Sequence, residues 1–535
     1  MDMVYQGTGT GLFWQGDEGT ILFDPEAIQS QLKNLEEKAT LVQQGEQIGL
    51  ATGGEISTSE GLPVLALSPA IPPRQLGDGG FLADHGLTLP YFAGSMANGI
   101  SSVEMVIALG KEGILASYGA AGQLPQVIEE AIERIQAALP NGPYCFNLIH
   151  SPNEPALEQE GVNLYLAKGV HCIEASAYLD LTPALVQYRV AGLYRDEEGR
   201  IQSKNRIIAK VSRKEVATRF MEPPSEKFLE SLLAQGKITT EQAEMSRQLP
   251  LAEDVTVEAD SGGHTDNRPL VTLLPSILAL RDEIQSAQAY KKVIRVGAGG
   301  GIGSPEAGLA AFAMGAAYIV TGSINQACIE SGTSDHVRKL LKEADMADVM
   351  SAPASDMFEQ GVKLQVLKRG TLFPMRAGKL WDFYSSYNSI DEIPASDRQR
   401  LEKQTFQRSI ASVWDETVAY FNVRDPEQIT KALANPRKKM ALIFRWYLGL
   451  TSHWANSGEK GREMDYQVWC GPSMGAFNDW VRGSYLEKPE QRRVTDVAHH
   501  LLHGAAYLYR VQQLKMQQLS LPLRFMAYRP SDQVR

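Results

Sequence analysis

The chain has 535 residues, of which 43% are hydrophobic and 21% charged, and these proportions exclude a chain that is disordered overall. Its formal net charge of −11 argues against nucleic acid as the main partner, because binding to phosphates favours a basic surface. The cysteines lie far apart with no CxxC pair, which argues against a zinc site or a disulfide framework. The start of the chain lacks the basic and apolar regions of a signal peptide, and no apolar run is long enough to span a membrane. We therefore expect a soluble, cytoplasmic protein.

Residues 1–90 precede the regular part of the chain. They read as irregular structure, with one short helical pattern at about 25–45 and turns rich in glycine and proline at 71–80. We expect them to form an N-terminal prologue that packs on a larger domain.

From residue 91, short apolar runs typical of buried strands alternate with amphipathic helical stretches. The connection at 213–252 is long enough for two helices, with Ser225 as an N-cap. An open doubly wound sheet fits the same alternation, but eight strands with no change of pattern favour a closed TIM-type (β/α)8 barrel over residues 91–330. The strand candidates are 91–95, 113–117, 144–148, 170–176, 206–211, 254–260, 292–298 and 316–323.

After residue 325 the strand pattern stops and the remaining sequence reads as helices. Six of the seven tryptophans lie there, which indicates a separate aromatic core. The expected fold is therefore an α/β barrel followed, over residues 331–535, by a mainly helical domain for a substrate or partner.

The ends of the seventh and eighth strands carry a candidate phosphate site. Gly299, Gly300 and Gly301 end one strand, Ser304 and Pro305 start a helix, and the next strand runs into Gly322 and Ser323. Exposed backbone amides and a helix N-terminus favour a phosphate dianion, and barrels often bind phosphate after strands seven and eight. The glycines do not fit the dinucleotide pattern GxGxxG. The alternative is that they only form tight turns.

A second distinctive segment, VEADSGGHTDNRP, follows the sixth strand. Gly262 and Gly263 permit close backbone approach, and His264 can transfer a proton near neutral pH. Catalytic groups occupy loops at this end of a barrel, although His264 could simply bond within its loop. Further candidates at strand ends are Gly94, Ser95, Met96, Asn147 and Lys210, each of which could instead be a capping or solvated residue.

Other histidine and cysteine residues carry weaker signals. His499 and His503 lie on one helical face with His500 between them, but no third metal ligand is evident, so we expect no metal site. Cys470 is expected to be buried rather than nucleophilic.

The segments EADSGGHTDNRP and VGAGGGIGSPEAGLAAFAMGAAYIVTGS resemble the nitronate monooxygenase and FabK-type superfamily of FMN barrels. The form of the histidine loop, the opening FAGSMANGISS and the long helical C-terminus are similar to the PfaD group, the trans-acting enoyl reductases of polyunsaturated fatty acid and polyketide synthases. The resemblance implies FMN-phosphate contacts from Gly299, Gly300, Gly301, Gly322 and Ser323. It implies flavin-ring contacts from Gly94, Ser95, Met96, Asn147 and Lys210, and an active-site role for His264 beside Gly262 and Gly263.

The resemblance also implies NADPH as reductant of FMN, and an enoyl thioester on an acyl carrier protein as substrate. Two alternatives stay open: a nitronate monooxygenase-like flavin oxidoreductase and a non-catalytic flavin-binding scaffold. The oligomeric state is also open, with a homodimer among the alternatives. The basic cluster Arg437, Lys438, Lys439 and Arg445 is either a docking surface for an acidic carrier protein or an ordinary solvated helix end.

Overall fold

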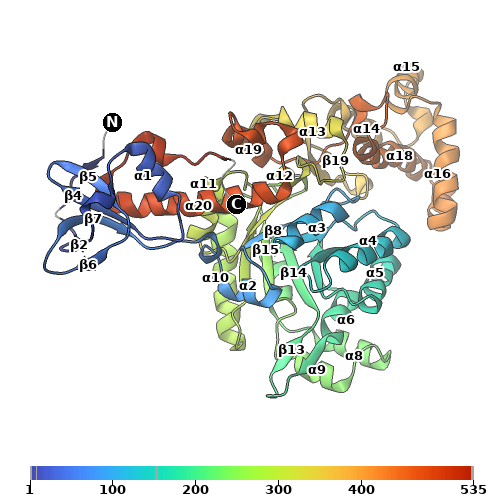
Figure 1. Cartoon of the computed structure of the whole chain (residues 1–535). Coiled ribbons are helices and arrows are strands. Elements are labelled where there is room, and N and C mark those ends of the chain that lie inside the picture. The colour runs from blue at the N-terminus through green and yellow to red at the C-terminus, as the bar shows by residue number, and fades with distance from the viewer. Residues whose placement is uncertain (1–2, 8, 151–154, 532–535) are drawn as a thin grey trace.

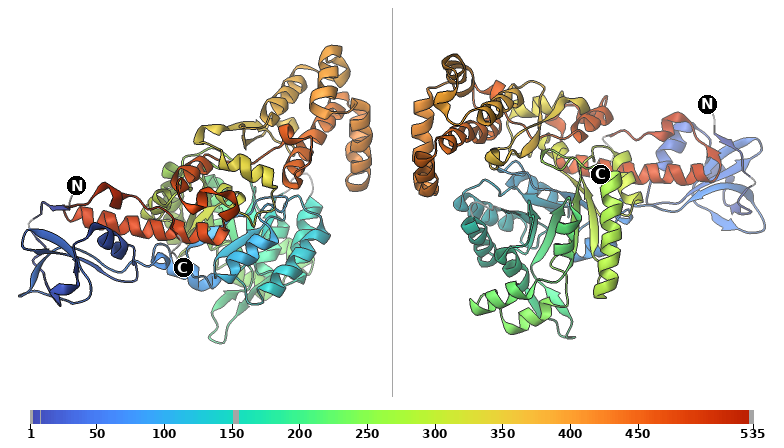
Figure 2. Two further views of the ribbon diagram at one scale, coloured as in Figure 1. Left: turned by 45° about the horizontal axis from the view of Figure 1, so that its top comes forward. Right: turned by 180° about the vertical axis from the view of Figure 1, so that it is seen from behind.

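The computed structural model describes residues 3–7, 9–150 and 155–531. A central β/α barrel lies between a small N-terminal β-sheet on one side and a largely helical region above the C-terminal ends of its strands (Figure 1). The two outer parts extend in opposite directions from the barrel, as Figure 2 shows from two other sides.

Eight parallel strands, all within the described residues, close the barrel, which confirms the predicted fold class. Each falls within or beside the range expected from the sequence, because each is an apolar run bounded by turn residues. In chain order they are β8 (Tyr91–Ala93), β9 (Leu115–Tyr118), β10 (Cys145–Ile149), β11 (Cys172–Ser176), β14 (Arg206–Val211), β15 (Asp254–Glu258), β17 (Arg295–Gly299) and β18 (Ile319–Thr321). Strand β18 pairs with β8 to complete the ring.

A buried charged network closes the N-terminal end of the barrel. Helix α2 (Gly79–His85) brings His85 within 2.8 Å of Asp254 at the start of β15. Arg295, at the start of β17, donates to Asp254 at 2.6 Å and to Asp84 at 2.7 Å. Burial by itself would lower the pKa of His85, but the Asp254 carboxylate outweighs it and raises the pKa to about 9.

Helices on the outside of the barrel pack around these strands. They are α3 (Val103–Lys111), α4 (Pro125–Ala138), α5 (Pro155–Ala167), α6 (Pro183–Ala191), α7 (Lys214–Met221), α10 (Leu270–Gln288) and α11 (Pro305–Ala313). The predicted start of α11 is correct: Ser304 caps it by accepting from the Ala307 amide, and Pro305 is its first residue.

The last barrel helix comes from the far end of the chain. After β18 stands only the short α12 (Ser323–Gln326), and the place between α11 and α3 is filled by α20 (Val494–Met516). The chain leaves and re-enters the barrel at one point, where the Ile329 amide donates to the Arg492 carbonyl at 2.9 Å. The Val494 amide also donates to the Glu330 carboxylate at 3.0 Å. The region between these points is therefore an insertion in the barrel, and α20 belongs to the barrel rather than to a separate C-terminal domain.

The long connection at 213–252 contains α7, α8 (Glu226–Ala234) and α9 (Thr240–Ser246), one helix more than expected. Ser225 is the residue before α8, as predicted, although its side chain makes no capping bond. A hairpin of β12 (Leu193–Arg195) and β13 (Ile201–Ser203), with β12 packed next to α9, was not anticipated.

The expectation of irregular structure in residues 1–90 is wrong. Within the described residues there is an antiparallel sheet in the order β3-β5-β4-β7-β2-β6. Its elements are β2 (Phe13–Gln15), β3 (Ile21–Leu22), α1 (Pro25–Leu32), β4 (Ala39–Gln44), β5 (Gln47–Ala51), β6 (Glu55–Ser57) and β7 (Leu62–Ser68). Several strands have only two or three residues, too few for a period-2 pattern to be visible in the sequence. The helical pattern at 25–45 merged α1 with the start of β4.

Helix α20 also anchors this sheet. Its buried Arg510 donates to the carbonyls of Leu32 and Asn34, at 2.9 and 2.8 Å. Strand β1 (Val4–Tyr5) pairs with β21 (Leu519–Ser520) just beyond the helix. The N-terminal sheet and the barrel thus share one helix.

The insertion between β18 and α20 is mainly helical, but the expectation that strands stop after residue 325 is wrong. Strands β19 (Val349–Pro353) and β20 (Lys363–Leu367) form a hairpin, and β16 (Gly263–His264) pairs with β20. The helices are α13 (Asp335–Lys342), α14 (Phe373–Ser386), α15 (Ala395–Arg400), α16 (Ile410–Arg424), α17 (Pro426–Ala434), α18 (Pro436–Ser457) and α19 (Ser473–Val481). An aromatic core that includes Phe358, Phe406 and Phe444 holds α14 and α18 together. Among the described residues, no helix is long and apolar enough to cross a membrane.

We predict that Asp254→Asn lowers the free energy of unfolding by about 3 kcal/mol, because it leaves buried His85 and Arg295 without their shared carboxylate. Thermal unfolding followed by circular dichroism measures the effect. Asp282→Asn is the matched control, since the Asp282 side chain is 70% exposed on α10 and its change should be about 0.5 kcal/mol or less. Equal midpoints for the two variants would contradict the structural role of the network.

Candidate functional site

The ends of β17 and β18 form an open backbone cradle. Gly301 and Gly322 would each place an added Cβ in open space, with no heavy atom within 4 Å. The amides of Gly301, Gly322 and Ser323 donate no hydrogen bond to another described residue. Two adjacent strand ends therefore carry three backbone donors without a partner among the described residues, which suits an anion.

Gly300 has a different structural role. Its φ is +89°, and an added Cβ would lie 2.7 Å from the backbone of Ala259. This glycine lets the end of β17 pack against the segment that leads to the histidine loop. Gly299 is buried at the end of β17, where it pairs with Glu258 of β15.

The inner wall of the barrel beside this cradle is charged. Lys210, near the end of β14, has its ammonium 2.8 Å from Glu258. Burial would lower the pKa of Lys210, but the carboxylates of Glu258 and Glu174 outweigh burial and raise it. The lysine is thus held as a cation between two carboxylates.

The loop after β8 is fixed to the same wall. The Ser95 amide donates to the Glu174 carboxylate at 2.8 Å, and the Met96 amide donates to the Ser101 hydroxyl at 2.9 Å. The hydroxyl of Ser101 in turn donates to the Gly94 carbonyl. On β10, the Asn147 amide group donates to the Ser176 hydroxyl and to the Glu174 carbonyl, so its donors are used within the chain.

The His264 loop is held by the insertion as well as by the barrel, where Asp266 accepts from Arg213 just after β14. Gly263 and His264 pair with Gln365 and Leu364 of β20. An added Cβ on Gly262 would lie 2.7 Å from the Cys470 backbone, so close approach of the two segments requires this glycine. The Gly471 amide donates to the Ser323 hydroxyl at 3.1 Å, which joins the same segment to the end of β18.

Asp356, from the loop between β19 and β20, contacts His264 with its carboxylate 3.2 Å from Nε2. The His264 side chain is 42% exposed. Desolvation would lower the pKa of His264, but Asp356, and Glu258 behind it, raise it above its ordinary value. The contact engages Nε2, and Nδ1 has no hydrogen-bond partner in the part of the chain that the structure describes.

The sequence matches two families. Residues 14–70 match the family described as "Fatty acid synthase subunit PfaD N-terminal domain". Residues 387–466 match "[Acyl-carrier-protein] S-malonyltransferase, inserted helical domain".

A solved structure, the enoyl reductase domain of MlnA from the macrolactin biosynthesis cluster of Bacillus amyloliquefaciens, is 40% identical, with a TM-score of 0.79. The match covers 83% of this chain and 100% of that domain. The chain belongs to the PfaD family. The part of its fold that this match covers therefore has a relative of known structure.

Curated relatives of this PfaD-family chain are larger proteins. A polyunsaturated fatty acid synthase subunit of Thraustochytrium sp. is 51% identical over 82% of this chain and 30% of the relative. Polyketide biosynthesis protein PksE of Bacillus subtilis is 44% identical over 84% of this chain and 58% of the relative. The chain thus spans less than two thirds of the length of these relatives.

Sequence reasoning missed two residues of this site. Glu174 stood inside the apolar run VHCIEAS, where a charged residue in a buried strand was an available signal. Asp356 had no signal, because it lies 92 positions after the histidine that it contacts.

The other clusters noted in the sequence lie away from the barrel mouth or are engaged within the chain. His500 on α20 contacts the hydroxyls of Tyr485 and Tyr528, at 3.0 and 2.8 Å. In the basic cluster, Lys438 and Arg445 contact Glu359, at 2.6 and 3.5 Å. Arg437 stacks over the Tyr384 ring and Lys439 over Trp414, so the charges of this cluster serve intramolecular contacts.

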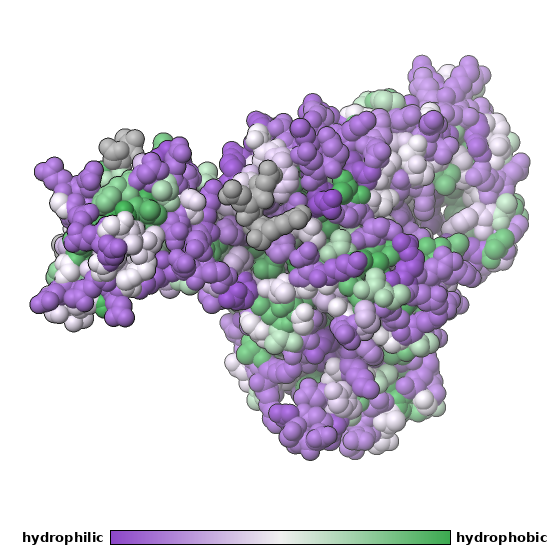
Figure 3. Space-filling model, viewed as in Figure 1, coloured by the Kyte–Doolittle hydropathy of each residue, from purple (hydrophilic) through white to green (hydrophobic). Residues whose placement is uncertain are grey.

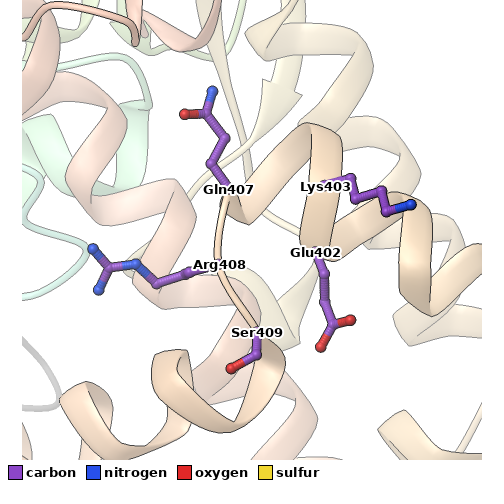
Figure 4. Close-up of a pocket in the computed structure, with 5 residues that line it drawn as sticks. All are labelled: Glu402, Lys403, Gln407, Arg408 and Ser409. Carbon is purple, nitrogen blue, oxygen red and sulfur yellow. The ribbon is translucent and has the colours of Figure 1, made fainter.

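A surface hollow of about 550 Å³ lies on the insertion, at the turn before α16 (Figure 4). Its lining side chains have structural roles: Glu402 accepts from the Ile410 amide, and Arg408 pairs with Glu416 and stacks on Trp446. It contains none of the barrel-mouth residues. The surface above the barrel is a mixture of polar and apolar residues in the view of Figure 3.

We predict that Asp356→Asn lowers the pKa of His264, because it removes the carboxylate that stabilises the imidazolium. Titration of isotope-labelled histidine by NMR measures the shift. Asp391→Asn, on the exposed side of the insertion, is the control and should leave the His264 titration unchanged. An unaltered pKa in the Asp356 variant would mean that the contact does not persist in solution.

Proposed function

We propose that this chain is an FMN-dependent enoyl reductase that uses NADPH to reduce the α,β-double bond of an enoyl thioester. The thioester would be carried on an acyl carrier protein of a polyunsaturated fatty acid or polyketide synthase. The observation that carries the proposal is the 40% identity to a complete enoyl reductase domain, the match covering all of that domain. The relatives named as synthase or polyketide biosynthesis proteins support the same pathway class.

The residues of the barrel mouth fit FMN. A phosphate group would be bound by the three unpartnered amides of Gly301, Gly322 and Ser323, in the volume that an added Cβ would enter at Gly301 or Gly322. Lys210 and the loop of Gly94, Ser95 and Met96 would border the isoalloxazine ring. No second glycine cradle of this kind stands among the described site residues, which favours FMN over FAD.

Bound FMN would supply hydride transfer between the nicotinamide and the enoyl β-carbon. The protein's own contribution is a proton and a polar environment at the thioester. His264, whose pKa is raised by Asp356, can hold a proton near neutral pH and deliver it to the α-carbon or donate to the thioester oxygen. Lys210 supplies a fixed positive charge beside the ring.

The position of the insertion supports the proposal that the substrate is carried by a protein. It supplies Asp356 and the segment at Cys470 to the barrel mouth, so a carrier protein that reached the site would pass beside it. Part of it, residues 387–466, matches a domain described from an acyl-carrier-protein transferase. We therefore assign the acyl carrier protein to this side of the molecule.

We predict that Gly322→Asp abolishes FMN binding in a folded protein. Its φ of −131° lies outside the left-handed region that favours glycine and its Cβ meets no atom within 4 Å, so the fold tolerates the change, while the carboxylate repels the phosphate. Flavin absorbance after purification and titration with FMN measure the loss. Gly322→Ala is the control and should retain most of the flavin, which should be released as FMN rather than FAD. Gly300 is the poorer test position, because any side chain there strikes the Ala259 backbone.

We predict that His264→Ala retains FMN and its reduction by NADPH but loses about 10²–10³-fold in the rate of enoyl thioester reduction. Stopped-flow measurement of flavin bleaching separates the two half-reactions. His171→Ala is the control with wild-type rates, because His171 is exposed just before the start of β11. Failure of the wild-type protein to reduce any carrier-bound enoyl thioester, together with turnover of a nitronate, would instead favour the monooxygenase alternative.

A further inference from the structure

One buried carboxylate at the barrel mouth has an oxygen without a partner. Glu174 lies on β11, points into the barrel and is fully buried. Its Oε2 accepts from the Ser95 amide at 2.8 Å, whereas its Oε1 has no hydrogen-bond partner among the described residues. Burial of an unpaired carboxylate oxygen is unfavourable, so such an atom calls for a donor from outside the chain.

The position of Oε1 identifies where that donor would come from. A Cβ added to Gly94 would lie 3.4 Å from Oε1, so this oxygen borders the end of β8. Lys210 attracts Glu174 electrostatically, but the hydrogen bond of its ammonium goes to Glu258. The free oxygen therefore stands beside a lysine that does not satisfy it, at the mouth of the barrel.

We infer that Oε1 of Glu174 accepts a hydrogen bond from the N3–H group of the flavin ring, and so selects the orientation of that ring. The inference rests on the proposed FMN site. The pyrimidine edge of an oxidised flavin has a single N–H donor between two carbonyl acceptors. A carboxylate acceptor next to an ammonium donor complements a neighbouring N–H and C=O on that edge.

Glu174→Gln tests the inference by replacing one carboxylate oxygen with an NH2 group. The Ser95 amide requires an oxygen opposite it, so the glutamine must direct its NH2 group toward the former Oε1 position. That group is a donor, and it would face the N3–H donor of the ring. We expect the dissociation constant of FMN to rise about 10–100-fold, which fluorescence titration of the apoprotein measures.

Glu158→Gln is the matched control. Glu158 is a buried carboxylate on α5, but both of its oxygens have partners, among them the Tyr178 hydroxyl at 3.1 Å and the His150 ring at 3.0 Å. Because both oxygens already have partners within the chain, its glutamine variant should bind FMN like the wild-type protein. A variant of Glu174 that binds FMN with wild-type affinity would overturn the inference.

An analogue of the ligand removes the same hydrogen bond from the other side. N3-methyl-FMN has no donor at this position, so the wild-type protein should bind it at least about tenfold more weakly than FMN. In Glu174→Gln the dissociation constant of N3-methyl-FMN divided by that of FMN should be about tenfold or more lower than in the wild-type protein. The reason is that the variant no longer accepts a hydrogen bond from the N3–H group of FMN. The wild-type measurement stands even if the variant does not fold.

Two results would contradict the inference in different ways. Equal wild-type affinities for FMN and N3-methyl-FMN, or the same ratio in wild type and variant, would overturn the role of Glu174 while leaving the flavoenzyme proposal intact. A wild-type protein that binds neither flavin would overturn the proposed function and this inference with it.

Discussion

The structure depends on the point where the chain leaves the barrel and returns to it. Two backbone donors, from Ile329 and Val494, join the segments of chain that flank the insertion. Because these two points are adjacent, the chain can add a large helical region without opening the barrel. The same closure lets α20 fill the place between α11 and α3 and continue to the N-terminal sheet. All three parts of the molecule are therefore positioned by one junction.

The candidate site is composite because of that arrangement. The barrel supplies the backbone cradle and the inner charges, whereas the insertion fixes the loop that carries His264 through β20 and the backbone at Cys470. Lys210 faces two carboxylates rather than one, so these three ionised groups together carry a net negative charge. A barrel separated from its insertion would keep the cradle but lose the partners of the histidine loop.

Much of the fold could be predicted from the sequence because the barrel strands are local features. Most are short, mainly apolar runs, and the glycines at 299–301 and 322 mark positions that adjoin open space or tolerate close backbone approach. The N-terminal sheet was not predicted, because three of its strands have only two or three residues and most of its pairings, apart from the β4–β5 hairpin, join segments that are not adjacent in the chain. The β19–β20 hairpin was obscured by its helical surroundings. The carboxylate of Asp356 meets His264 only through tertiary pairing, which no local pattern records.

Because β18 and α20 are far apart along the chain, the barrel cannot finish folding until late in its synthesis. During synthesis the ribosome releases all eight strands before the helix that covers the last of them, and the whole insertion must be translated in between. At about 5–20 residues per second this interval lasts on the order of ten to thirty seconds. Throughout it, the apolar groove between α11 and α3 has no cover, and Leu501 and Ala505, which later pack against Gly308, are not yet made. The nascent barrel would then expose a hydrophobic surface that chaperones recognise. The insertion would fold before the last helix of the barrel has been made.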